Sequence, residues 1–347
     1  MTQYPVLLVG SIAGFDSETE VFENVVRVLG SHVKRIPDGE TGPRAQWIGW
    51  QNEWIAQNPS LQRIPPERVH QPKDRPTKYK GRPQYEVVLS GLTDTLRFAD
   101  LGYATAARHS YKSFADLKKS GRIASGTRFQ VSLPTPMAIA VAYFDPASQK
   151  LAEPALEARM LEEVREILGF IPHDQLAIQW DVAVEVQVLE GLAFAHFENL
   201  PQGVTDRLVR LGEAVPTDVE LGYHLCYGDY GHRHFKEPED TALLVEMANA
   251  LFEAIQRRVT WLHLPVPRNR DDDNYYAPLR HLNLPRGTEL YLGLVHFSDG
   301  IEGARRRMTV ASRYCKNFGI STECGLGRRP PETIQTLLEI HRHLAAG

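Results

Sequence analysis

The chain has 347 residues, of which 42% are hydrophobic, and a formal net charge of −4. This length is enough to bury a large core and permits one big barrel or two ordinary domains. The 39 basic residues are scattered and no apolar run approaches the roughly 20 residues that a spanning helix needs, so nucleic acid and membranes are disfavoured as partners and a small molecule is favoured.

Short apolar, β-branched runs alternate with longer amphipathic stretches, which is typical of βα units around a parallel sheet. The predicted strands are residues 5–9, 32–36, 128–132, 176–180, 219–224, 259–264, 289–295 and 318–322. Predicted helices, in which apolar residues recur every three or four positions, are clearest at residues 18–29, 156–168, 240–258, 300–316 and 331–344. Eight strands with interleaved helices predict an α/β fold of the (β/α)8 TIM-barrel type, with residues 1–347 forming a single domain.

One long stretch interrupts this alternation. Residues 58–84 are rich in Pro, Lys and Arg, and proline in particular disfavours the interior of a strand or a helix. We therefore predict a long loop that makes an excursion over the mouth of the barrel.

The start of the chain and its cysteine count both indicate a cytoplasmic protein. The first ten residues, MTQYPVLLVG, lack the charged leader of a signal peptide. The three cysteines are an odd number in a long chain, which is typical of reduced thiols rather than of a disulfide framework.

Polar or ligand-type residues follow nearly every predicted strand. In barrels of this type the active site forms at the C-terminal ends of the strands, so these residues are candidates for the site. In chain order they are Ser11, Asp38, Glu40, Thr135, Asp181, His224, Cys226, His263, His296, Glu323 and Cys324. A salt bridge or a helix N-terminal cap is the alternative interpretation of Glu40 and Asp181, and Ser11 is also a candidate cap for the first helix.

His224 and Cys226 are the clearest candidates for metal binding. They lie two residues apart at the end of a predicted strand, so their side chains share a face, and Cys324 follows a distant strand. Zinc favours imidazole and thiolate ligands, and its catalytic sites typically use three protein ligands with one open position. The H-x-C pattern is short, however, and a buried cysteine beside a core histidine is the alternative interpretation.

Five short segments at the predicted strand ends form an ordered set. They are Val9-Gly10-Ser11, Asp38-Gly39-Glu40 with Arg44, Ile178-Gln179-Trp180-Asp181, His224-Leu225-Cys226 and the run GISTECGLGRR at residues 319–329. In this order they resemble I-G-S-F-P, H-G-E-x-x-R, Q-I-D-E-P, H-x-C and P-D-C-G-L-K-T-R of the C-terminal catalytic domain of cobalamin-independent methionine synthase. The resemblance spans the whole chain and places it in the barrel superfamily that also includes uroporphyrinogen decarboxylase.

The resemblance implies a zinc-dependent methyl or alkyl transferase with a small-molecule thiol, similar to homocysteine, as its acceptor. In that family zinc binds the thiol and holds it as the thiolate that attacks a methyl group, because coordination to a cation removes the thiol proton. The implied cofactor is zinc, with His224, Cys226 and Cys324 as ligands.

The resemblance also implies residues that bind the substrate. Ser11, Glu40 and Asp181 correspond to residues that hold the amino-acid part of the substrate, with the two carboxylates pairing with its ammonium group. Arg328 and Arg329 are candidate anchors for an anionic substrate group, or else solvated charges.

Two histidines, His263 and His296, depart from the family's motifs. His263 stands where the family has a glutamate ligand, and it is a candidate fourth zinc ligand or a substrate contact. His296 takes the place of the family's aspartate after the seventh strand. We predict His296, together with His232 of the glycine-rich segment 227–234, as catalytic residues for proton transfer, with a surface position as the alternative for His232.

The methyl or alkyl donor is not defined by the sequence. Residues 132–137, SLPTPM, resemble the family's G-P-V-T-M only loosely, and the tryptophan that follows it there has no counterpart, so folate as donor stays open. Two other functions stay open on the same barrel: a metal-free lyase or decarboxylase and a non-catalytic relative that binds a ligand. Formation of a homo-oligomer is also left open.

Overall fold

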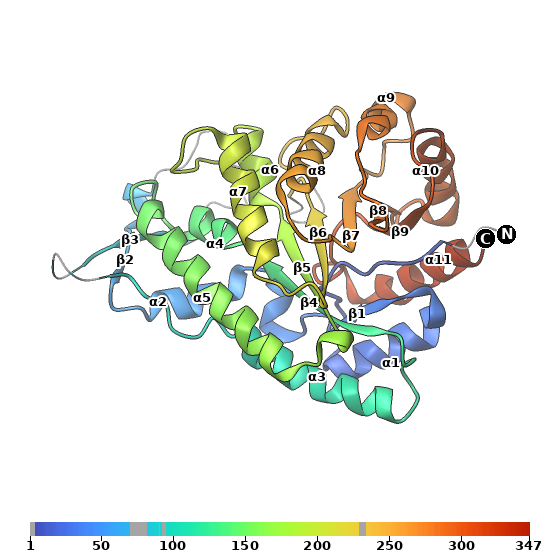
Figure 1. Cartoon of the computed structure of the whole chain (residues 1–347), viewed down its shortest axis with the longest axis horizontal. Coiled ribbons are helices and arrows are strands. Elements are labelled where there is room, and N and C mark those ends of the chain that lie inside the picture. Colours follow the sequence, from blue (N-terminus) through green and yellow to red (C-terminus); the bar gives the residue numbers. More distant parts are fainter. Residues whose placement is uncertain (1–3, 70–81, 90, 92–94, 229–233) are drawn as a thin grey trace.

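Seven parallel strands form one curled sheet in the part of the chain that the computed structural model describes, residues 4–69, 82–89, 91, 95–228 and 234–347 (Figure 1). The strands are β1 (Arg35–Pro37), β4 (Arg128–Pro134), β5 (Leu176–Val182), β6 (Glu220–Leu225), β7 (Trp261–Pro265), β8 (Glu289–Val295) and β9 (Phe318–Thr322). They follow one another around the sheet in chain order. Every residue of β5 is buried, as expected for a parallel strand covered on both faces. The predicted α/β class is confirmed.

The predicted first strand, residues 5–9, is not a continuous strand. Val6 forms isolated parallel bridges to Val33 and Ile320, and backbone N–H groups donate from Val6 to His32 (2.8 Å) and from Leu7 to Ile320 (3.0 Å). The pairing is short because proline at position 5 has no N–H to donate. This segment therefore lies between the two edges of the sheet, at the start of β1 and at β9.

Helices surround the curled sheet (Figure 1). They are α1 (Glu18–Leu29), α2 (Asn52–Ala56), α3 (Tyr103–Lys119), α4 (Pro136–Tyr143), α5 (Gln149–Phe170), α6 (Val184–Leu189), α7 (Leu200–Glu213), α8 (Ala242–Ala254), α9 (Asp273–Tyr276), α10 (Gly300–Tyr314) and α11 (Ile334–Ala346). Helix α1 shows why such a segment folds: Ser17 caps it by accepting a hydrogen bond from the Glu20 N–H, and Val21, Val25 and Leu29 bury one face. All five predicted helical regions contain a helix.

The excursion at residues 58–84 contains more regular structure than predicted. Its described residues include strand β2 (Leu61–Arg63), which pairs antiparallel with β3 (Tyr85–Val87). The expectation of a loop is therefore wrong for residues 61–63, because a three-residue strand fits between Pro59 and Pro65. Residues 70–81 lie outside the described part of the chain.

Aromatic side chains and a buried arginine fill the end of the sheet where the strands begin. Leu7, Ala177, Trp261 and Tyr291 form a separate buried cluster, and their strands are not all neighbours, so these side chains meet inside the curl. Arg35 lies over the Trp261 ring at 4.3 Å. This end is a solid core, and open space is left at the ends where the strands finish.

None of the helices in the described part of the chain has the length and apolar character needed to cross a membrane.

Candidate functional site

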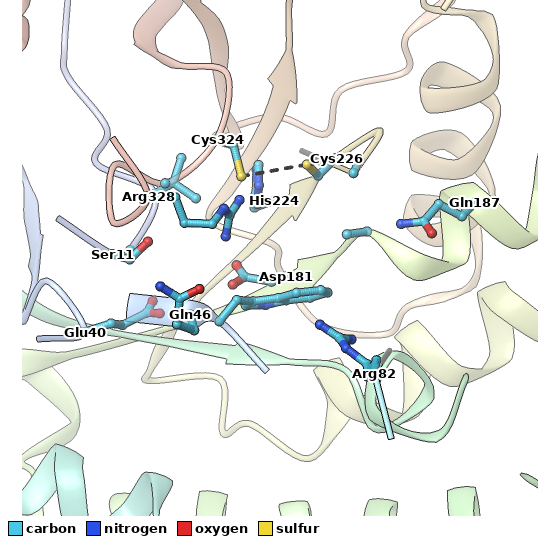
Figure 2. Close-up of a pocket in the computed structure, with 16 residues that line it drawn as sticks. Ser11, Glu40, Gln46, Arg82, Asp181, Gln187, His224, Cys226, Cys324 and Arg328 are labelled. Carbon is cyan, nitrogen blue, oxygen red and sulfur yellow. Dashed lines mark hydrogen bonds between the residues drawn. The ribbon is translucent and has the colours of Figure 1, made fainter. Parts of the chain in front are cut away.

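Three metal-ligating side chains meet where the strands end (Figure 2). His224 belongs to β6, Cys226 follows that strand and Cys324 follows β9. Their ligand atoms all lie within 4.8 Å of one another, and the two sulfur atoms are 3.9 Å apart. Because β6 and β9 are not neighbours in the sheet, it is the curl that brings the three residues together. The structure thus brings the three predicted ligand side chains together.

His263 contacts His224 but is not one of the three clustered residues. It is the register partner of His224 on the adjacent strand β7, and the two Nδ1 atoms are 2.6 Å apart. Its Nε2 lies 3.1 Å from the carbonyl oxygen of Thr322. Burial, and then the neighbouring His224, hold the pKa of His263 well below its usual range. Both ring nitrogens therefore have partners, and the structure brings together three of the four predicted ligands.

The donor set of the cluster fits zinc. One imidazole nitrogen and two cysteine sulfurs are ligands that zinc favours, and three protein ligands leave one coordination position for a substrate. Hydrogen bonding with Cys226 holds the pKa of Cys324 well below its usual range, against the raising effect of burial, and His224 lowers it further. A thiolate, which is the form that binds a metal, is thus favoured at Cys324.

Asp181 stands beside the cluster at the end of β5. It is the register partner of His224, and its Oδ1 accepts a hydrogen bond from Gln179 at 2.9 Å. Burial raises the pKa of Asp181 to about 6, although the charge of His224 and hydrogen bonds from Gln179 and Trp47 oppose this rise. The carboxyl group therefore gains or loses a proton close to neutral pH.

Glu40 reaches the same pocket from the loop after β1. Its backbone has a φ of 47°, a conformation that side-chain-bearing residues rarely adopt, and its N–H donates to Asp38 Oδ1 at 2.9 Å. A Cβ at Gly10 would lie 2.4 Å from Glu40 Oε1, so the glycine makes room for this carboxyl. Burial, reinforced by the charge of Asp181, raises the pKa of Glu40 well above its usual range.

Asp38 and Arg44 hold the loop that presents Glu40. Arg44 Nη2 is 2.7 Å from Asp38 Oδ2, and Ser110 donates to the same oxygen at 2.7 Å. Asp38 therefore has a supporting role, and Arg44 pairs with it.

Ser11 lines the pocket and joins two of its loops. Its Oγ accepts a hydrogen bond from the Gly327 N–H at 3.2 Å, and its carbonyl accepts one from the Leu326 N–H at 2.6 Å. The alternative that Ser11 caps the first helix is wrong, because Ser17 occupies that position.

The pocket between these residues has further polar walls. Its lining also includes Gln46, Trp47, Arg82, Gln187 and Arg328. Arg328 points into the space between Cys324 and Asp181 (Figure 2), and its charge lowers the pKa of both Glu40 and Cys324. The sequence had marked Arg328 by its place after Cys324, whereas Arg82 and Gln187 carried no motif that would identify them.

Of the two predicted catalytic histidines, the structure describes only His296. His296 follows β8 and its Nε2 donates to the carbonyl oxygen of Val266 at 2.8 Å, while burial lowers its pKa to about 3. His296 is absent from the pocket lining among the described residues, so as placed it holds the loop after β7. His232 lies outside the described part of the chain.

A third histidine, His234, links the two loops that carry the cysteines. Its Nε2 is 2.6 Å from Glu323 Oε1, and its Nδ1 is 3.2 Å from Glu237 Oε2. Burial opposes protonation, but these two carboxylates outweigh it and raise the pKa of His234 to about 9. The ion pair with Glu323 therefore connects the segment after β6 with the residue next to Cys324.

Comparisons with known proteins show the fold. No protein-family model matches the chain, and no curated protein matches it at a significant level. A vitamin-B12-independent methionine synthase from a Shewanella species, solved in complex with selenomethionine, matches with a TM-score of 0.64 and 13% identity, over 99% of this chain and 97% of that chain. A methyltransferase from Methanosarcina mazei matches with a TM-score of 0.51 and 13% identity, over 99% and 94% of the two chains. The chain therefore shares the fold that its motifs predicted, over nearly its whole length.

Proposed function

We propose that this protein is a zinc-dependent methyl or alkyl transferase that binds a small thiol as its acceptor. The observation that carries the proposal is the meeting of His224, Cys226 and Cys324 at the wall of a polar pocket. Bound there, zinc would lower the pKa of a substrate thiol and hold it as a reactive thiolate. Structures of similar fold that are described as a methionine synthase and a methyltransferase support this class of reaction.

We propose further that residues 1–347 form one closed barrel domain, with the segment at Val6 as its eighth strand. The bridges from Val6 to Val33 and Ile320 support this closure. A closed barrel would hold the loops after β6 and β9 at a fixed separation, which a three-residue metal site requires.

The side chains around the cluster suit the acceptor's amino-acid end. Asp181 and Glu40 are buried carboxyl groups with raised pKa values, and a bound ammonium group would favour the ionised form of both. Arg328 lies between them and Cys324 and would pair with a carboxylate, since guanidinium matches its geometry. We therefore assign a homocysteine-like thiol to this side of the pocket.

The donor would approach from the other side of the pocket. Arg82 and Gln187 line the pocket, and Figure 2 shows both on the side away from Ser11 and Glu40. Attack on an alkyl carbon requires the donor's carbon in line with the thiolate, so these residues would orient the donor.

Metal content tests the proposal. Elemental mass spectrometry on tag-free protein should find about one zinc per chain, and Cys324→Ser should lose it. Cys315→Ser is the matched control, because Cys315 is also a free thiol but contacts the Ala311 carbonyl at 3.4 Å rather than the cluster. Protein that is folded yet takes up no zinc would contradict the mechanism and favour metal-free proton transfer by the raised-pKa carboxyls.

A further inference from the structure

The hydrogen-bond partners of His263 determine which of its two ring nitrogens carries the proton. A carbonyl oxygen only accepts hydrogen bonds, so His263 Nε2 must donate to Thr322, 3.1 Å away. His263 has no exposed surface, and a buried positive charge on its ring would be costly, so the ring is neutral. Its Nδ1 then carries a lone pair and can only accept.

The proton position on His224 follows from this. The two Nδ1 atoms are 2.6 Å apart, and since that of His263 accepts, that of His224 must donate. The lone pair of His224 is therefore on Nε2, and Nε2 is the atom left to bind a metal beside Cys226 and Cys324.

We propose that His263 is a positioning residue, which holds His224 in the tautomer and orientation for metal binding through Nε2 and is not itself a ligand. This inference rests on the proposed function, because it takes the cluster to be a metal site. Histidine ligands generally donate their second N–H to an outer partner that determines tautomer and ring orientation. Here that partner is the neutral imidazole of His263, which in turn donates a hydrogen bond to the backbone carbonyl of Thr322.

These hydrogen bonds also connect the part of the site on β6 with the loop that carries Cys324. His263 on β7 thus bonds to His224 on β6 and to the backbone carbonyl of Thr322. The side chain of Thr322 in turn donates to the Cys324 carbonyl at 2.8 Å and so holds the loop after β9. Three ligands leave one coordination position open, and two thiolates balance the charge of a zinc ion, so a neutral His263 adds no charge to the centre.

Two variants separate positioning from ligation by metal affinity. His263→Asn retains an acceptor near the Nδ1 position, whereas His263→Leu retains none at similar volume. We expect the leucine variant to bind zinc about 10- to 100-fold more weakly, as is typical when an outer partner is lost, and the asparagine variant to recover most of that loss. Equal loss in both variants, with a changed visible spectrum of the cobalt-substituted protein, would show that His263 is a ligand.

The nitrogen that binds the metal can be observed directly. Protein labelled with nitrogen-15 in histidine and loaded with cadmium-113 should show metal coupling to one histidine only, His224, through Nε2, with a protonated Nδ1; His263→Asn and His263→Leu supply the assignments. Coupling to His263, or to His224 through Nδ1, would overturn this proposal while leaving the proposed function intact. Folded protein without any cadmium uptake would instead contradict both.

Discussion

At the scale of single residues, Asp181 lies beside the His224, Cys226 and Cys324 cluster in the same pocket. It is in register with His224 on the neighbouring strand, and burial raises its pKa to about 6. An ammonium group bound beside it would supply the positive charge that a buried carboxylate needs. The same carboxyl group would contribute little to the binding of a thiol that has no amino group.

We expect Asp181→Asn to weaken the binding of homocysteine to the zinc-loaded protein about 10- to 100-fold, because a hydrogen bond to a charged group contributes about 1.5–3 kcal/mol. Isothermal titration calorimetry measures this change. A thiol of similar length without the amino group is the control and should bind wild type and variant equally. Equal weakening for both thiols would mean that Asp181 does not bind the ammonium group.

His224, Cys226, Cys324, Asp181, Glu40 and Ser11 all line one pocket. The sequence could predict that these residues lie together, because each is a polar or ligand-type residue at or just after the end of a strand. The placement of His263 could not be predicted, since it depends on the register between β6 and β7 and on the carbonyl of Thr322. A sequence pattern does not distinguish a metal ligand from a residue that hydrogen-bonds to one.

At the scale of elements, a buried acid joins the helices that follow two adjacent strands. Glu185 of α6 has no exposed surface, and one of its oxygens accepts a hydrogen bond from Thr135, the N-cap of α4. Its other oxygen, Oε2, is buried without a hydrogen-bond partner. Burial therefore raises the pKa of Glu185 to about 7, more than the Thr135 hydrogen bond lowers it.

This raised pKa makes stability depend on pH. Between the unfolded value, about 4.3, and about 7, the folded protein binds the proton more tightly than the unfolded chain. The free energy of unfolding should therefore fall as pH rises through this window, by about 4 kcal/mol for this group, and level off above it. In denaturant titrations from pH 4.5 to pH 8, the free energy of unfolding of Glu185→Gln should therefore fall less with rising pH than that of wild type, by this amount. The exposed Glu246→Gln is the control and should behave as wild type; a Glu185→Gln profile parallel to wild type would contradict the assignment.

Strands and helices could be predicted from the sequence where apolar residues form short runs or recur at a regular spacing. The ranges 289–295 and 318–322 coincide with β8 and β9, because each is a short apolar run between polar loops. Helix α4 was missed because all of its residues are buried, so its sequence shows no alternation of faces. The hairpin of β2 and β3 joins segments more than 20 residues apart, and neither three-residue strand has a pattern of its own.

At the scale of the whole molecule, a network of buried ion pairs and the proposed metal site lie at opposite ends of the sheet. Arg35, at the start of β1, is buried over Trp261 and forms ion pairs with Glu220 and with Glu289, the latter at 2.9 Å. The cluster of His224, Cys226 and Cys324 lies where the strands end (Figure 2). Changes at one end should therefore leave the other unaffected.

Arg35→Met tests this separation. We expect the free energy of unfolding to fall by about 1.5–3 kcal/mol, because the variant removes the hydrogen bonds of a buried guanidinium to the partly buried Glu220 and Glu289, while zinc content stays as in wild type. Lys34→Met is the matched control: Lys34 pairs with Glu289 at 2.6 Å but is half exposed, so its loss should cost about 1 kcal/mol or less. Chemical denaturation and elemental analysis measure the two effects, and a loss of zinc in folded Arg35→Met would show that the two ends are coupled.

The central claim is that the substrate thiol binds as a thiolate at the open position beside His224, Cys226 and Cys324. X-ray absorption at the zinc edge, recorded on the zinc-loaded protein with and without homocysteine, tests it most directly because it counts sulfur atoms around the metal. We predict two sulfur ligands, from the two cysteines, and a third at the zinc–sulfur distance of about 2.3 Å when the thiol is added. A sulfur count that stays at two with saturating homocysteine would contradict the account.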